Sequence, residues 1–100
     1  MSFDFDEIVP LVGSKFLDIV PNKNDKELML IKEDNNKHDS NAIAVYSKRD
    51  GILTKLGFII KDKNVEIRNI MDSIKTTKLI RSDFKSNGRY YYYVAINLHK

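Results

Sequence analysis

Cysteine is missing from the chain, and its absence excludes disulfide bonds and thiolate metal sites and fits a reducing compartment. No apolar run approaches the ~20 residues that a membrane-spanning helix needs, so the sequence predicts no membrane partner. The first six residues contain two aspartates and no basic residue, whereas a secretory signal would begin with basic residues. We therefore expect a cytoplasmic protein.

Linkers rich in proline and serine, internal repeats and low-complexity stretches are also missing, so nothing divides the chain. One hundred residues that are 42% hydrophobic and 31% charged have the balance of one globular domain. We predict a single domain over residues 1–100. The net charge of +3 favours a polyanion only if folding gathers the lysines and arginines on one face.

Short apolar segments, separated by loops rich in Asn, Asp and Lys, predict strands. Gly13 marks a bulge or bend in the first of them. Asp50 and Gly51 supply a hairpin-type turn, so the segments on either side should pair. The predicted strands cover residues 8–17, 27–32, 41–47, 54–60, 78–84 and 89–98.

One helix is predicted between the fourth and fifth of these strands. Asp62 or Asn64 can cap its start. Its apolar face follows the helical spacing i, i+3, i+4, i+7 and consists of Ile67, Ile70, Met71 and Ile74. We expect this face to pack on the sheet.

The last predicted strand alternates between two faces. Its apolar face consists of Tyr90, Tyr92, Val94, Ile96 and Leu98. Its other face consists of Arg89, Tyr91, Tyr93, Ala95 and Asn97. Two tyrosine rings should therefore lie on the face that is more exposed to water.

Several short strands with one helix after the fourth are typical of a small barrel of the OB type. We therefore predict a mainly β fold with one main helix, arranged as a small OB-like barrel of about six strands. An α+β open sheet is the alternative.

The segment 32–41 concentrates polar residues, since eight of its ten residues are charged or carry an amide. It ends in the segment 42–45, Ala-Ile-Ala-Val, which has the character of a buried strand. A loop fixed at its exit by a core strand can hold Asn and Asp side chains in set directions, as specific recognition of a ligand requires. In the alternative interpretation, these side chains bond their own backbone in Asx-turns.

This segment resembles the HIRAN domain family. The pattern is acidic-Asn-Asn-x, an aromatic-like residue, Asp-x-Asn-Ala-Ile, and further on Leu-Gly-Phe at 56–58. Upstream, residues 12–16 match the family's Val-Gly followed by a basic and an aromatic residue. The resemblance covers most of the chain, and Asp39 before the Asn-Ala-Ile at 41–43 is its most specific part. It implies a modified OB-like barrel that binds the 3′ end of single-stranded DNA.

The resemblance assigns recognition of the 3′ end to Asp39. A carboxylate accepts the hydrogen bond of a free hydroxyl and repels a phosphodiester, so it can distinguish the end of a strand from its interior. A charge-assisted hydrogen bond of this kind is worth about 1.5–3 kcal/mol. The resemblance assigns hydrogen bonding with the terminal nucleotide to Asn36.

Aromatic side chains would stack on the bases. Phe16 stands where the family has an aromatic ring, and His38 stands where it usually has a tyrosine. Lys37 replaces a proline that is often found there, which loosens the loop and adds a cation. The alternatives are that Phe16 belongs to the core and that His38 is merely solvated.

Lys15 and Lys61 match basic positions of the family that meet the DNA backbone. Tyr91 or Tyr93 matches an aromatic residue, near the start of the last strand, that closes over the terminal base. The alternatives are solvated surface charges for the lysines and cross-strand packing for the tyrosines.

Other chemistries lack their residues. The sequence from Asp34 begins like a calcium loop, but Asp39 replaces the required glycine and Val45 stands where the loop needs glutamate. The chain has only two histidines, and no glycine-rich phosphate loop, so zinc and nucleotide-hydrolysis sites are not predicted. We predict a non-enzyme without a cofactor.

The leading hypothesis is a non-catalytic DNA-binding module that recognises 3′-hydroxyl ends of single-stranded DNA. It would act in DNA repair or replication-fork processing. A separate helicase or nuclease is a further expected partner. The alternative is a protein-interaction module of the HIRAN fold that lost end binding through the changes at His38 and Lys37. A small hydrolase is a third hypothesis, but it lacks a nucleophile and a base.

Overall fold

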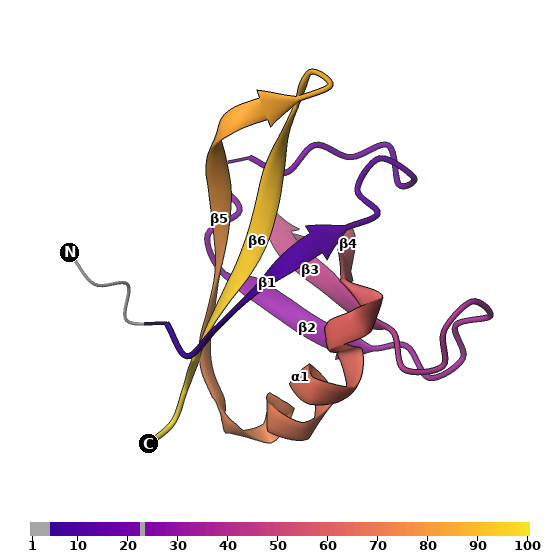
Figure 1. Cartoon of the computed structure of the whole chain (residues 1–100), viewed down its shortest axis with the longest axis vertical. Helices are drawn as coiled ribbons and strands as arrows, with labels where there is room; N and C mark the ends of the chain where they lie inside the picture. The colour runs from indigo at the N-terminus through magenta and orange to yellow at the C-terminus, as the bar shows by residue number, and fades with distance from the viewer. Residues whose placement is uncertain (1–4, 23) are drawn as a thin grey trace.

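The computed structural model describes residues 5–22 and 24–100, so most of the acidic start and one residue of the loop at 21–26 lie outside the described residues. The described part consists of six strands, one α-helix and two 3-10 helices (Figure 1). Their bounds in chain order are β1 (Glu7–Val12), β2 (Leu28–Lys32), β3 (Ile43–Arg49), β4 (Ile52–Ile59), η1 (Lys61–Lys63), α1 (Asn64–Ile70), η2 (Met71–Ser73), β5 (Ile74–Ser86) and β6 (Arg89–Leu98).

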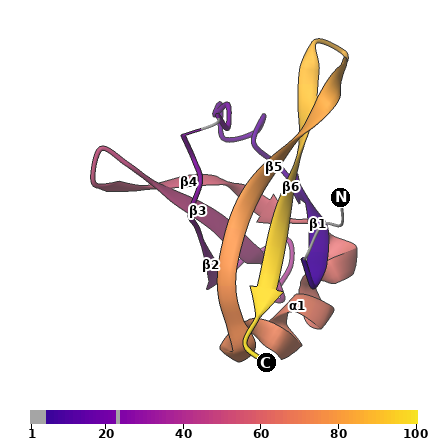
Figure 2. The same cartoon turned by 90° about the vertical axis from the view of Figure 1, so that its left-hand side faces the viewer.

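The strands form one antiparallel sheet in the order β2-β3-β4-β1-β6-β5. The sheet curls until its two edge strands lie side by side (Figure 2). A single bridge joins Glu27 to Lys78, and the Thr77 hydroxyl donates a hydrogen bond to the Leu28 carbonyl oxygen. The resulting half-barrel confirms the predicted mainly β fold with one helix and a small OB-like barrel.

The first predicted strand is wrong beyond Val12. Gly13 adopts a φ of 83°, in the left-handed region that favours glycine. The chain then turns instead of continuing the strand, and the Leu17 amide donates to the carbonyl oxygens of Gly13 and Ser14. The segment 13–17 is therefore an exposed turn at the end of β1. The predicted pairing of β3 with β4 is confirmed.

The predicted helix is longer than α1, because Ile74 begins β5 and β5 starts before the predicted residue 78. Ile67 is fully buried, and Ile70, Met71 and Ile74 pack partly buried against the core. The apolar face thus packs as expected, although it passes through three elements. The predicted caps are wrong, since no side chain caps α1.

The core lies between the two halves of the curled sheet. Its largest fully buried side chains are Val9, Ile43, Val45, Leu56, Ile59, Ile67, Val94 and Ile96. The two faces predicted for the last strand are confirmed at Val94 and Ile96, with Tyr92 and Leu98 packed against the core. Ala95 is also buried, although its face was expected to be polar.

A buried polar cluster ties the loop before β2 to β3. The Asp25 carboxylate accepts hydrogen bonds from Ser47 Oγ at 2.8 Å and from Arg49 Nη2 at 2.6 Å. Burial raises the pKa of Asp25, but the hydrogen bonds from Arg49, the Asn22 amide and Ser47 outweigh it and hold the pKa below its usual range. The cluster therefore contains a charged carboxylate inside the fold.

No helix in the described part of the chain is long and apolar enough to cross a membrane.

Candidate functional site

An arginine of α1, Arg68, holds the polar loop between β2 and β3 at several points. Arg68 Nε donates to the Asn41 carbonyl oxygen at 2.8 Å, and Nη2 donates to that of Ala42 at 2.9 Å. The same guanidinium pairs with the Asp34 carboxylate at 2.8 Å. An arginine presents several donors in one rigid plane, so it can hold three points of the loop at once. The loop is therefore fixed along its exit and is not a free connection.

Arg68→Ala is expected to lower the free energy of unfolding by about 2 kcal/mol, because it removes charge-assisted hydrogen bonds from a half-buried side chain. The amides of residues 34–42 should also exchange their hydrogens faster. Urea unfolding and hydrogen exchange measure the two effects. Lys63→Ala is the control, since its ion pair with Glu66 at 3.6 Å is exposed and should contribute less than about 0.5 kcal/mol. Equal behaviour of the two variants would show that Arg68 does not hold the loop.

The loop entrance is fixed by a second ion pair. Glu33 lies 2.5 Å from Lys55 Nζ, and the hydrogen bond from Lys55 holds the pKa of Glu33 below its usual range. Lys55 Nζ also lies 5.0 Å from the centre of the Phe58 ring, within the range of a cation–π contact. The side of the loop therefore carries a cation that is already paired with a carboxylate, and next to it an aromatic ring.

Asn36 shapes the loop from inside. Its Oδ1 accepts hydrogen bonds from the amides of His38 at 2.9 Å and Asp39 at 3.1 Å. Its Nδ2 donates to Glu33 at 3.1 Å. This geometry is that of an Asx-turn, the alternative that the sequence left open. Asn36 therefore holds the backbone that carries Asp39, and its contact with a nucleotide stays a prediction.

Asp39 lies between the loop and α1. Its Oδ1 accepts a hydrogen bond from the Asn41 amide at 2.9 Å, and its Oδ2 accepts one from Asn64 Nδ2 at 2.5 Å. The residue is half-buried. A carboxylate has about four lone-pair sites, so these two bonds fix its orientation and leave capacity for a further donor.

Asn64 is one of two site residues that the sequence did not reveal. It is 2% exposed, and its Oδ1 is buried without a hydrogen-bond partner among the described residues. Its position at the start of a helix suggested a cap, and no spacing rule connects it with a loop 25 residues away. Arg68 was missed for the same reason.

The turn 13–17 carries two further predicted residues. Phe16 is 95% exposed, which excludes the core position considered for it, and Lys15 is also exposed. The turn is held in place because Ser14 Oγ donates to the Leu56 carbonyl oxygen at 2.5 Å. A Cβ added at Gly13 would lie 3.1 Å from the Phe58 ring, so the turn packs closely on β4. An exposed ring on a fixed turn is suited to stacking.

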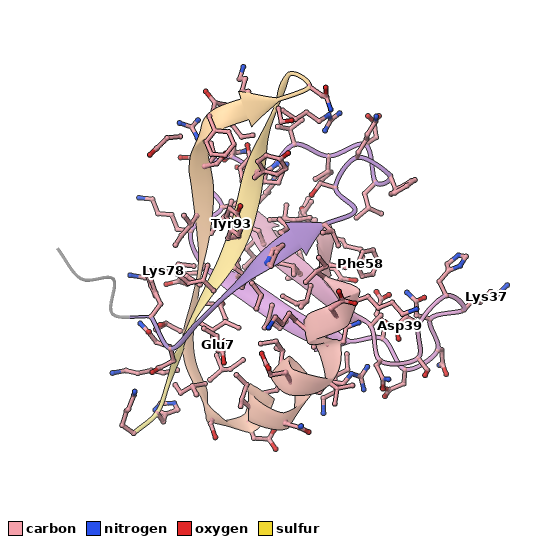
Figure 3. All side chains as sticks on the ribbon, viewed as in Figure 1. Glu7, Lys37, Asp39, Phe58, Lys78 and Tyr93 are labelled. Atoms are coloured by element: carbon pink, nitrogen blue, oxygen red, sulfur yellow. The ribbon has the colours of Figure 1, made fainter. Side chains whose placement is uncertain are left out.

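The remaining predicted residues fall in different places. Lys61 is exposed on η1, and its carbonyl oxygen accepts a hydrogen bond from the backbone amide of Asn64. Lys61 therefore lies one turn from Asn64, whose side chain bonds Asp39. His38 is exposed in the loop. Tyr91 is 47% exposed on β6 and Tyr93 is half-buried beside it. In Figure 3, Tyr93 lies over β5 and β6, whereas Asp39 lies in the loop on the other side of β1.

The structure thus brings part of the predicted set together. Asn36 and Asp39 are in direct contact, and Lys61 is adjacent through Asn64. The loop and the turn 13–17 project from the same side of the barrel (Figure 1). The two tyrosines belong to another surface.

Comparison with known proteins agrees with the resemblance of the sequence. The HIRAN domain family model matches residues 7–98, from the start of β1 to the end of β6. The match includes the loop, the turn 13–17 and α1. Comparison with curated proteins and with solved structures gave no match.

Proposed function

The chain belongs to the HIRAN domain family, a family of DNA-binding domains that are not themselves catalytic, and from this premise we propose that it recognises the 3′-hydroxyl end of single-stranded DNA. The observation that carries the proposal is the orientation of Asp39. Its carboxylate is half-buried and held from two sides, by Asn41 and Asn64. A fixed carboxylate can accept the hydrogen of a terminal hydroxyl, and it repels the phosphate that an internal nucleotide would carry there.

The neighbouring residues would bind the rest of the terminal nucleotides. Phe16 offers an exposed ring on which a base can stack. His38 offers an exposed imidazole in the loop, at the position where the family usually has a tyrosine. Lys15 and Lys61 are exposed cations that can meet the phosphates that precede the 3′ end. Asn36 acts as a positioning residue, because it holds the amide of Asp39.

The experiment compares two labelled single strands that differ only at the end, a 3′-hydroxyl and a 3′-phosphate. Fluorescence anisotropy is expected to show at least about tenfold tighter binding of the hydroxyl strand, the equivalent of a charge-assisted hydrogen bond of about 1.5 kcal/mol. Asp39→Asn keeps the shape of the side chain and removes its charge, so it is expected to abolish the difference.

Asp62→Asn is the matched control, because it removes an exposed carboxylate of η1 that has no ion pair in the described part of the chain. It should leave the preference for the hydroxyl strand unchanged. Equal affinity of the wild-type protein for both strands would reject end recognition. A preference that survives Asp39→Asn would assign it to another residue.

We further propose that the module acts in the cytoplasm, in DNA repair or replication-fork processing, where free 3′ ends arise. A helicase or nuclease on another chain would then act on the captured end. Co-purification of such an activity with the wild-type protein, and its loss with Asp39→Asn, is the result that this part of the proposal requires.

A protein-interaction module is the second candidate, and one observation favours it. The outer face of the strands β1 and β6 and the adjoining part of β5 exposes large apolar side chains, among them Ile8, Val12, Phe84 and Tyr91. Such a face can be covered by a protein partner. No binding of either DNA strand at low salt would favour this second function.

A further inference from the structure

A groove runs between residues 14–22 and 24–26 on one side and the far half of the β5–β6 hairpin on the other. Its volume is about 1030 Å³. Figures 1 and 2 both show the segment after β1 running beside the end of this hairpin. The groove is separate from the loop that carries Asp39, because no residue of that loop is among its lining residues, whereas the turn 13–17 contributes Ser14 and Lys15.

The groove gathers positive charge. Its charged lining residues are Lys15, Asp25, Lys26, Arg81, Lys85 and Arg89, a formal net charge of +4. The whole chain has a net charge of only +3. The Asp25 carboxylate is already paired with Arg49 at 2.6 Å, so it does not offset the five cations. Folding has therefore assembled the one-sided basic surface that the sequence required of a polyanion binder.

The five cations have no acidic partners within the part of the chain that the structure describes. Two of them lie against an aromatic ring instead. The Arg81 guanidinium carbon lies 4.0 Å from the centre of the Tyr90 ring, and Lys85 Nζ lies 5.0 Å from it. These contacts hold the cations in place without neutralising them. Like charges held together repel one another, and a bound polyanion would relieve that repulsion.

We propose that this groove binds the phosphodiester backbone of single-stranded DNA. A positively charged groove with aromatic side chains is the arrangement that follows a single strand without reading its sequence. Tyr90 and Tyr92 line the groove from the face of β6 that lies opposite to the Tyr91 ring, and the Tyr90 ring carries Arg81 and Lys85 against it. An acidic polypeptide would use the cations but not the rings.

The groove also gives the strand a direction. If the 3′ end is held at Asp39, the preceding nucleotides cross the turn that carries Phe16 and enter the groove beside Lys15. This direction rests on the proposed function. Binding of the backbone in the groove does not, because it follows from the charge and the rings of the hairpin alone.

The test measures how the affinity for a strand of about 16 nucleotides depends on salt. The strand carries a 3′-phosphate, so that end recognition does not contribute. Arg81→Gln/Lys85→Gln keeps the long side chains over Tyr90 and removes both charges. The slope of log K against log salt should become shallower by about 1.4, since each phosphate contact with a single strand contributes about 0.7. Thermal unfolding confirms that the hairpin is intact.

Lys48→Gln/Lys75→Gln is the matched control, because both lysines are exposed and lie outside the groove. It should leave the slope unchanged. An unchanged slope in Arg81→Gln/Lys85→Gln, or an equal change in the control, would overturn the proposal. So would tighter binding of poly-glutamate than of DNA with the same dependence on Arg81 and Lys85.

A short strand of about 4 nucleotides with a 3′-hydroxyl separates the two proposals. The groove variant should keep the preference for the hydroxyl on this strand, and Asp39→Asn should keep the salt slope on the long one. If the wild-type protein shows no preference for the 3′-hydroxyl, while Arg81→Gln/Lys85→Gln still makes the salt slope shallower, end recognition is rejected and binding in the groove is supported.

Discussion

Asp25→Ala is expected to lower the free energy of unfolding by about 3 kcal/mol, the lower end of the range for breaking a buried ion pair. The Asp25 side chain is 1% exposed, and it receives hydrogen bonds from Ser47, Arg49 and the Asn22 amide. Its removal leaves the buried Ser47 hydroxyl without its acceptor. Arg49 is 30% exposed, so its charge can reach water, which keeps the loss from being larger.

The effect of Asp25 should also depend on pH. Because the folded-state pKa is lowered, the stabilisation is complete above the unfolded value of about 3.9 and is lost as the pH falls through the folded-state pKa. Asp25→Asn should therefore differ most from the wild-type protein at neutral pH and converge with it in acid. Asp6 and Glu33 also have lowered pKa values, so the difference between the two proteins is the quantity to use.

Urea unfolding of wild-type protein, Asp25→Ala and Asp25→Asn measures both effects. Asp72→Ala is the control, because this exposed residue of η2 should change stability by less than about 0.5 kcal/mol. A loss below about 1 kcal/mol for Asp25→Ala would show that the cluster contributes no more than a surface hydrogen bond.

Gly57→Ala is expected to destabilise the fold by about 3 kcal/mol, the upper end of the usual range for overpacking. A Cβ at Gly57 would collide with the Val12 carbonyl oxygen and would lie 3.1 Å from both Leu11 Cδ1 and Ser14 Oγ. The obstacle is backbone, which cannot move away as a flexible side chain can. The same segment holds the turn with Lys15 and Phe16, so the variant should also bind single-stranded DNA more weakly.

Gly51→Ala separates steric overlap from backbone strain. Gly51 has a φ of 79°, and an added Cβ would meet nothing within 4 Å. Its replacement should therefore cost only the strain of a left-handed residue, about 1 kcal/mol. Equal losses for the two variants, measured by thermal unfolding, would contradict the steric explanation for Gly57.

Periodicity predicted the elements that local pattern determines. The alternation at 89–98 placed Val94 and Ile96 in the core correctly, and the Asp50 and Gly51 turn paired β3 with β4. The first strand was predicted too long because apolar residues return at positions 16 and 17 after Gly13, whereas the backbone conformation of Gly13 ends the strand. Local pattern also could not show where α1 ends, because the apolar residues that begin at Ile67 keep their helical spacing into η2 and β5.

The candidate site was harder to predict because its contacts join distant segments. The resemblance of the loop to the HIRAN family assigned Asn36 and Asp39 to one site, and the two residues are in contact. Nothing in the sequence connected Arg68 or Asn64 with that loop, since only the folded chain brings α1 beside it. The basic groove could not be predicted from the sequence either, because its lysines and arginines come from segments that are far apart in the chain.

The closure of the barrel gives the fold a weak point. Where the edge strands β2 and β5 meet, one bridge and the hydroxyl of Thr77 replace a full ladder of backbone hydrogen bonds. Local opening there breaks few bonds, and the carbonyl of the buried Leu28 loses its partner first. Transient opening between β2 and β5 can therefore admit solvent to the core while the other strand pairs keep their hydrogen bonds.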